Sequence, residues 1–164
     1  MSTTIGEIRA AIKTALAANT VAGGYHYDLT GSDQVMQGWV DRPPRAGLAH
    51  VMVAHWDVTI EPGQPLTQNT NRATFFLEAS APTTVDTSDA RTTAAEQLAS
   101  DVLKCLRKAT IDTGGGIRAI TSAQVTDLTF DVEPLPTLDG EIFEWAQVAI
   151  KVTFTYRLSV TGGL

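Results

Sequence analysis

The sequence predicts an α+β domain with a mostly antiparallel or mixed β-sheet, two α-helices packed on one face and a long C-terminal β-hairpin. Two segments, 4–18 and 89–110, carry apolar residues at the three- and four-residue steps of a helix. The last third of the chain alternates apolar and polar residues instead. Because helices and strands do not alternate strictly, a doubly wound parallel sheet is disfavoured. The 164 residues suit a single domain, 1–164.

The first helix is expected over 4–18. Thr4 and Glu7 have the spacing of a capping box, in which each side chain bonds a backbone N–H group of the first turn. One apolar stripe follows, made by Ile5, Ile8, Ile12 and Leu16. Asn19 and the two glycines that come soon after it are expected to end this helix.

Strands are expected between the two helices at 25–29, 35–39, 48–60 and 75–79. In the long strand 48–60, the even-numbered apolar side chains are expected on one face and Val51 and Val53 on the other. Proline, glycine and polar residues predict loops at 42–48 and 61–71.

The second helix is expected over 89–110, with Asp89 among its possible caps. Its buried stripe consists of Ala95, Leu98, Val102, Cys105, Leu106 and Ala109. Three basic residues fall in its last turns, where they suit the helix dipole, and the glycines at 114–116 are expected to end it.

The final strand is expected over 146–160, where apolar residues keep one parity for fifteen positions. It is expected to form a hairpin with the alternating segment around 127–133, through the turn residues of 134–141. If the turn centres near Leu138, Asp127 lies opposite Lys151 and Phe130 near Val148.

The composition limits the possible functions. The net charge of −6 argues against a free-standing DNA-binding protein, which needs a basic surface for phosphates. A single cysteine makes no internal disulfide, and neither a signal peptide nor a membrane span is apparent in the sequence. We therefore expect a soluble protein that is made in the cytosol and has no membrane partner.

A search for chemistry finds no active site. His50 and His55 have opposite parity on one strand, so they are expected on opposite faces and unable to share a metal. Cys105 falls on the buried stripe of the second helix, where a cysteine acts as a small apolar residue. The glycines at 114–116 follow a helix and lack the G-K-[ST] of a phosphate loop. We expect no catalytic residue, no cofactor and no metal.

Two sets of residues are candidates for contact with partners. The first is a possible subunit-facing surface that consists of Asp127, Asp131, Glu133 and Lys151. The second is a pair of loops represented by Arg42, Arg45, Gln64 and Asn69. The alternative reading of the loops is that they are mobile hairpin tips. A long final strand and a long polar loop exceed what a compact domain needs, and such elements often pair with a neighbouring copy.

The chain resembles the tail terminator (tail completion) proteins of long-tailed bacteriophages. The resemblance lies in the opening I-R-x-A-I-K-x-A-L helix, the tyrosine-rich segment 25–29, the alanine-rich helix 89–110 and the final strand with Tyr-Arg-Leu at 156–158. It covers nearly the whole chain, but it is a likeness of element order and not of a catalytic motif.

The resemblance implies a homo-oligomeric ring, usually a hexamer, at the head-proximal end of the tail. Such a ring stops polymerisation of the tail tube and offers a docking face to the head–tail connector. Its partners are the tail tube protein and the connector protein, and DNA passes through its lumen without specific binding. The surface of Asp127, Asp131, Glu133 and Lys151 is then a possible lumen face, whose acidic residues would repel the DNA. The implied location is the virion, after synthesis in the host cytoplasm.

Three other functions stay open at the level of sequence. A head–tail connector or stopper has a similar appearance. A tail tube subunit is expected to be richer in strands and to lack an opening helix. A small α+β enzyme or ligand-binding domain belongs to another class, and it is expected to show a deep pocket with convergent polar groups and shifted pKa values.

Overall fold

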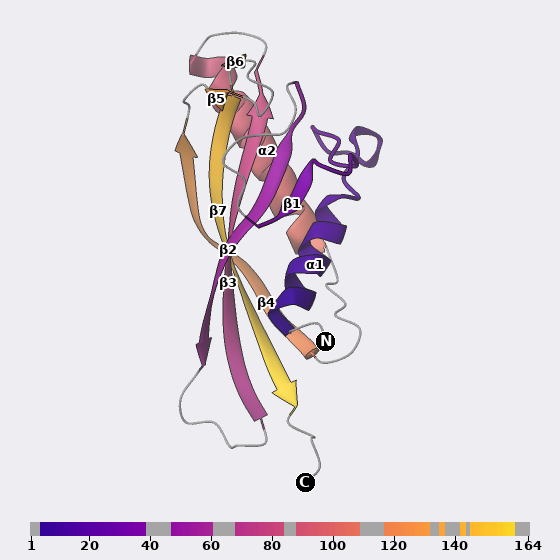
Figure 1. The fold of residues 1–164 in the computed structure, drawn as a ribbon, viewed down its shortest axis with the longest axis vertical. Helices are drawn as coiled ribbons and strands as arrows, with labels where there is room; N and C mark the ends of the chain where they lie inside the picture. Colours follow the sequence, from indigo (N-terminus) through magenta and orange to yellow (C-terminus); the bar gives the residue numbers. More distant parts are fainter. Residues whose placement is uncertain are drawn as a thin grey trace.

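The structure is a computed structural model of the chain, shown in Figure 1. It describes residues 4–38, 47–60, 68–83, 88–108, 117–131, 135–136, 142–143 and 145–159. Within these ranges the fold is α+β: a mixed five-stranded sheet has strand order β1-β2-β3-β7-β4, and a second, two-stranded sheet pairs β5 with β6.

The elements follow one another along the chain as α1 (Thr4–Leu16), a 3-10 turn η1 (Val21–Gly23), β1 (Val35–Gln37), β2 (His50–Ile60), β3 (Gln68–Pro82), α2 (Ser88–Lys108), β4 (Ile117–Asp131), β5 (Leu135–Pro136), β6 (Ile142–Phe143) and β7 (Trp145–Ser159). In the large sheet, β1 runs parallel to β2 and every other neighbouring pair is antiparallel. The predicted α+β class, the mixed sheet and the two helices are therefore confirmed.

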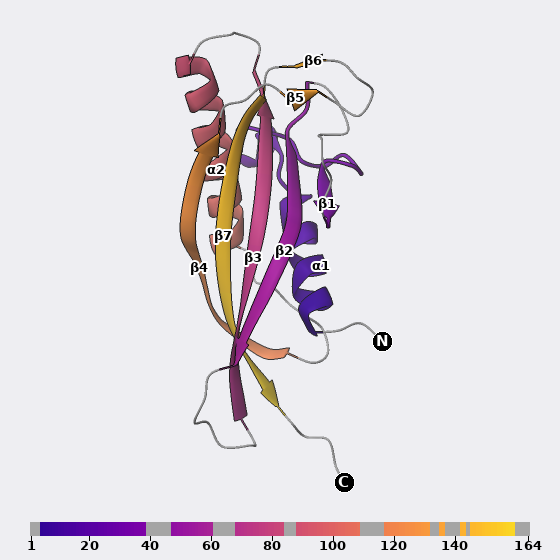
Figure 2. The ribbon, with the colours of Figure 1, turned by 60° about the vertical axis from the view of Figure 1, so that its left-hand side comes forward.

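Both helices lie on one face of the large sheet, so the core is a single layer between them and the strands (Figure 2). The apolar stripes predicted from the sequence are the faces that the two helices bury against the sheet. In α1 the fully buried residues are Ile8, Ile12 and Leu16, and in α2 they include Ala95, Leu98 and Val102. The strands contribute the alternate residues Phe75, Leu77 and Ala79 of β3 and Ala146, Val148, Ile150 and Val152 of β7. The strict alternation of β7 thus marks the core face of a central strand.

The first predicted strand, 25–29, is wrong. This segment is a loop in the structure, and Tyr25 and Tyr27 pack against the core as partly buried side chains. The predicted strand at 35–39 is shorter, because β1 is described only from Val35 to Gln37.

The prediction of which side chains of the long strand 48–60 share a face is wrong beyond the middle of the strand. A register shift lies between Val53, which is opposite Leu77, and His55, which is opposite Phe76. One residue is therefore extra in β2, as in a β-bulge, and the parity of every later position changes. Met52 lies opposite Glu78 and away from the helices, whereas position 56 lies opposite the core residue Phe75.

Two other boundaries differ from those expected. The predicted loop 61–71 is shorter, because β3 begins at Gln68, and Asn69 lies in this strand opposite Leu158. The strand before the C-terminal connection is longer than predicted, because β4 begins at Ile117.

The pairing of β4 with β7 has Asp127 opposite Lys151 and Phe130 opposite Val148, the two pairs expected from the sequence. The long C-terminal hairpin itself stays a prediction, since most of the connection between these strands lies outside the described residues. Inside the predicted turn segment 134–141, the short strand β5 pairs with β6.

The sheet is longer than the helical layer that covers it. β3, β4 and β7 each have 15 residues, which corresponds to about 50 Å of strand. α2 has 21 residues, about 31 Å of helix. The ends of β2, β3 and β7 accordingly extend past both helices (Figure 1). This overhang is the feature that a domain folding only for its own core does not need.

Candidate functional site: the open face of the sheet

The face of the large sheet opposite the helices, here called the open face, carries most of the polar residues of the strands. The strand pairings align it in transverse rows across β4, β7, β3 and β2. Three successive rows are Asp127, Lys151, Phe76 and His55; Gln124, Thr153, Thr74 and Asp57; and Ser122, Thr155, Arg72 and Thr59. Together these three rows form a broad polar surface that contains a single phenylalanine, Phe76.

Charges on the open face are mixed, with an excess of acid. Positions of this face hold the carboxylates Asp57, Glu78, Asp127 and Asp131 and the cations Arg72, Lys151 and Arg157. Four acidic and three basic residues give this face a small excess of the sign of the whole chain, whose net charge is −6. Such a surface repels a polyanion more than it attracts one.

Neighbouring side chains of the open face contact one another. The Lys151 Nζ lies 5.5 Å from the centre of the Phe76 ring, within the range of a cation–π contact. The hydroxyl oxygens of Thr74 and Thr153 are 3.1 Å apart and share a hydrogen bond. Partial burial raises the pKa of the Glu78 carboxyl. The surface is therefore packed laterally, although no helix of the described residues covers it.

One end of the open face is covered. His50, Met52 and Ser80 project to this side by their register, yet each is buried. β5 and β6 lie at this end of the molecule (Figure 2). The exposed part of the open face is consequently its middle and its overhanging end, where Asp57, Thr59 and Arg72 are exposed.

Of the predicted contact residues, the structure brings Asp127 and Lys151 together as opposed strand positions and places Asp131 opposite Gln147 on the same side. Asn69 belongs to β3 and not to a loop. The remaining four, Glu133, Arg42, Arg45 and Gln64, lie outside the described residues.

The two histidines of β2 differ from expectation. Because of the bulge, His50 and His55 lie opposite Ser80 and Phe76, positions of equal parity, and so on the same side of the sheet. Five residues of strand still separate them by roughly 15 Å, which is too far for one metal ion. No group of three or more potential metal ligands occurs among the residues that the structure describes.

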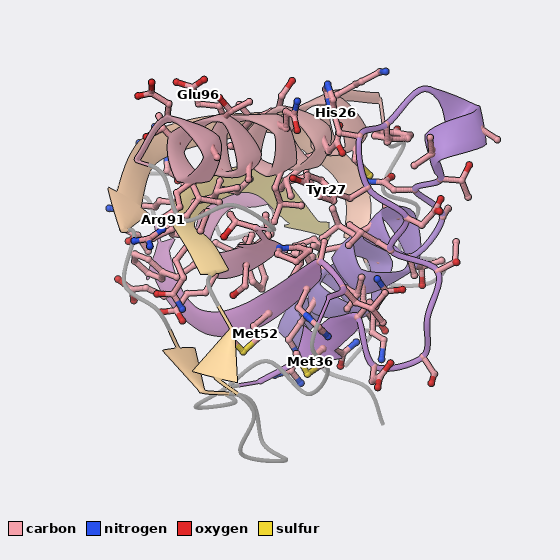
Figure 3. All side chains as sticks on the ribbon, turned by 90° about the horizontal axis from the view of Figure 1, so that it is seen from above. His26, Tyr27, Met36, Met52, Arg91 and Glu96 are labelled. Carbon is pink, nitrogen blue, oxygen red and sulfur yellow. The ribbon has the colours of Figure 1, made fainter. Side chains whose placement is uncertain are left out.

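Sequence reasoning missed the polar cluster around Asp101. This carboxylate lies on the inner side of α2, with the residue 1% exposed. It accepts hydrogen bonds from the backbone N–H of His26 at 2.7 Å, from that of Tyr27 at 2.9 Å, and from the His26 Nδ1 at 2.8 Å. Figure 3 shows His26 and Tyr27 beside α2. The sequence pattern of α2 does not distinguish the buried Asp101 from the exposed polar residues of the same helix.

Lys104, one turn further along α2, fixes the same loop. Its Nζ donates to the carbonyl oxygen of Gly24 and lies 4.8 Å from the centre of the Tyr25 ring. Gly24 has φ of 86°, the left-handed conformation that favours glycine, and ends the turn η1. Asp101 and Lys104 thus attach the loop to the helix, which is a structural function and not a catalytic arrangement.

The single thiol is also structural. Cys105 is buried on α2, and desolvation raises the pKa of its thiol to about 11, with a smaller opposite effect from the Asn19 side chain. At pH 8 the thiolate is then on the order of one part in a thousand. We expect iodoacetamide to leave Cys105 unmodified in the native protein and to react once urea unfolds the chain, as measured by intact mass. Rapid modification without urea would contradict the burial.

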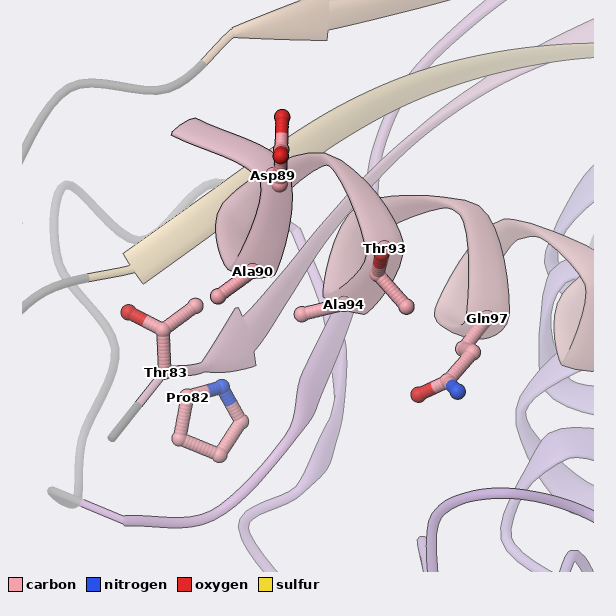
Figure 4. Close-up of a pocket in the computed structure, with 7 residues that line it drawn as sticks. All are labelled: Pro82, Thr83, Asp89, Ala90, Thr93, Ala94 and Gln97. Carbon is pink, nitrogen blue, oxygen red and sulfur yellow. The ribbon is translucent and has the colours of Figure 1, made fainter. Parts of the chain in front are cut away.

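One groove lies beside the first turns of α2, with a volume of about 350 Å³ (Figure 4). Its lining consists of Pro82, Thr83, Asp89, Ala90, Thr93, Ala94 and Gln97. Asp89 is its one ionisable side chain and is exposed. A nucleophile, a general base and an oxyanion donor do not converge here, so the described part of the groove offers no catalytic constellation.

The fold and the open face define a class of domain: a two-helix α+β unit whose sheet is longer than its helical layer and polar on its outer side. No family model and no curated protein matches the chain. The fold is similar to that of a chain in a solved structure described as the virion of a native gene transfer agent particle, with a TM-score of 0.50 and 14% sequence identity. The alignment covers 96% of this chain and 99% of the other. No helix of the described residues is long and apolar enough to cross a membrane.

Proposed function

We propose that this chain is a structural subunit of a phage-like virion and that it acts as a tail terminator. The observation that carries the proposal is the end-to-end similarity of its fold to a chain of a gene transfer agent virion. Because almost the whole of each chain is aligned, the shared unit is the complete domain and not a common substructure. The sequence resemblance to tail terminators supports the finer assignment.

Two features of the structure favour a terminator over a tail tube subunit and over an enzyme, and a head–tail connector or stopper stays the alternative. The opening helix α1 packs into the core through Ile8, Ile12 and Leu16, and a tail tube subunit is expected to lack such a helix. An enzyme is expected to gather perturbed ionisable groups in a pocket, whereas the groove beside α2 holds one exposed carboxylate. These features support a subunit without covalent chemistry.

In the proposed ring, the open face lines the lumen and the helices lie outside. The acidic excess of this face, which includes Asp127 and Asp131, then repels passing DNA and keeps it from adhering. Lys151 lies opposite Asp127 and moderates the local charge. A map of the ring with these positions on its outer wall would contradict this orientation.

The proposed partners are further copies of the chain, the tail tube protein below the ring and the head–tail connector above it. The loop residues Arg42, Arg45 and Gln64 are proposed to meet these partners. Asn69 is reassigned to the overhanging part of β3, where it belongs to the sheet. The proposed location is the head-proximal end of the virion tail, and no membrane takes part.

The test is to add the purified protein to polymerising tail tubes and to measure their lengths by electron microscopy. We expect the tubes to stop growing and to carry one added ring at a single end, because a terminator binds the last tube ring and offers no surface for the next one. The matched control is Glu96→Ala, a change on the exposed side of α2, which is expected to stop growth equally well. Tubes that continue to lengthen at saturating protein would refute the terminator assignment.

A further inference from the structure

The large sheet has two strand edges without a strand partner among the described residues. β4 is the terminal strand on one side and is 15 residues long. On the other side, β1 pairs with β2 only at Val51–Val53, so no second described strand pairs with β2 from His55 to Ile60. Long uncovered edges present rows of backbone N–H and C=O groups that pair readily with another strand.

The directions of the strands make these two edges mutually compatible. Along β2, β3, β7 and β4 every neighbouring pair is antiparallel, so β4 runs opposite to β2. If β4 of one copy meets β2 of the next, the new pair is antiparallel as well. The antiparallel order of these four strands therefore continues from copy to copy.

The two edges also lie at the same level of the sheet. The row that contains Thr59 in β2 ends at Ser122 in β4, and the row that contains Asp57 ends at Gln124. The rows of His55 and Ile60 end at Asp127 and Ile120, so pairing of 55–60 with 120–127 requires little displacement along the strands. A contact that relates copies by rotation with little translation closes into a ring, whereas one with a large translation gives an open helix.

The chemistry of the edges leaves them available for such pairing. β4 contains no proline and no lysine, two of the residue types that often protect an edge strand, and its register with β7 shifts after Ile117, Ile120 and Val125. Proline is also absent from β2 after the bulge. The shortness of β1 restricts protection to the part of β2 that lies next to α1, which leaves the overhanging part uncovered.

From these observations we infer that a second copy of this chain pairs its β4 edge, residues 120–127, with the His55–Ile60 edge of β2, so that one sheet runs around the ring. The inference deepens the proposed function and rests on it. Each copy uses both edges, one toward each neighbour, which is the head-to-tail arrangement of a cyclic oligomer. The open faces of all copies then form one continuous inner wall.

Disulfide trapping tests the contact directly. Residues opposed across antiparallel strands have Cβ atoms about 5 Å apart, near the spacing that a disulfide needs. We expect the double variant T59C/S122C or T59C/Q124C to form covalent oligomers on oxidation, with each copy linked to two others. The matched control T59C/T92C places the second thiol on the exposed side of α2 and is expected to stay uncross-linked. The native Cys105 is buried and is kept in all variants.

Hydrogen exchange on the unmodified protein supplies an independent measurement. In rings isolated at high concentration, amides within 55–60 and 120–127 are expected to exchange more slowly than in dilute monomers, by about tenfold or more. A ring of defined native mass with neither cross-links nor protection at these edges overturns the inference and leaves the ring function intact. A chain that stays monomeric at every concentration and fails to stop tube growth overturns both. Cross-linked polymers without a size limit overturn ring closure.

Discussion

Replacement of Asp101 by alanine is expected to lower the free energy of unfolding by about 3 kcal/mol. The carboxylate accepts three hydrogen bonds from the loop, two of them from the backbone N–H groups of His26 and Tyr27. With alanine, these donors lose their acceptor beside a residue that is 1% exposed, and no solvent replaces it readily. Urea unfolding followed by circular dichroism measures the change.

Two further variants separate the loss of hydrogen bonds from a general effect on the helix. Asp101→Asn keeps one acceptor oxygen of similar shape, so its loss of stability is expected to be smaller than that of Asp101→Ala. Glu96→Ala removes an acidic residue that points away from the core on the same helix and is expected to leave stability unchanged (Figure 3). An equal loss in Glu96→Ala would show that acidic charge on α2, and not the contacts of Asp101, sets the effect.

The same contacts explain why the sequence predicts a strand where the structure has a loop. The alternation of Tyr25, Tyr27 and Leu29 is that of a half-buried strand, and the structure does direct these side chains toward the core. However, the backbone N–H groups that a strand needs for its ladder donate to Asp101 instead. The acceptor lies more than 70 residues away in sequence, so local patterns contain no sign of it.

The helices and the central strand were predictable because their signal is local. Ile8, Ile12 and Leu16 repeat at the period of the helix that they form, and the apolar residues of β7 repeat at the period of a strand. The β-bulge after Val53 was not predictable, since an extra residue changes the partner of each later position without changing the composition.

The open face was predictable only in part. The sequence indicates that Asp127 and Lys151 oppose each other, because both flank strongly alternating segments. It does not indicate that β3 begins at Gln68, because the residues at this end are polar and resemble a loop. It does not indicate that β4 begins at Ile117, where register shifts interrupt the regular pairing of the strand. The Gln68 end of β3 lies in the overhang beyond the helices, where the core does not require apolar residues (Figure 1). Periodicity therefore identifies the covered part of a strand and misses the part that a partner is proposed to use.

Two adjacent phenylalanines of β3 give the second large effect, and they test which face of the sheet is the core. Phe75 is fully buried between the sheet and the helices, while Phe76 lies on the open face, partly buried beside Lys151. Phe75→Ala is expected to lower the free energy of unfolding by about 4 kcal/mol, because it removes a buried ring and leaves a cavity. The midpoint of urea unfolding measures the loss.

Phe76→Ala is the matched control, with the same residue type, the same strand and the same substitution. For the isolated subunit its cost is expected to be about 1 kcal/mol, since the ring is only partly removed from water and its main loss is the contact with Lys151. A cost equal to that of Phe75→Ala in a monomeric sample would mean that the open face is a second core. A small cost, combined with normal ring formation, would mean that this face stays in contact with solvent after assembly, as the inner wall of a channel does.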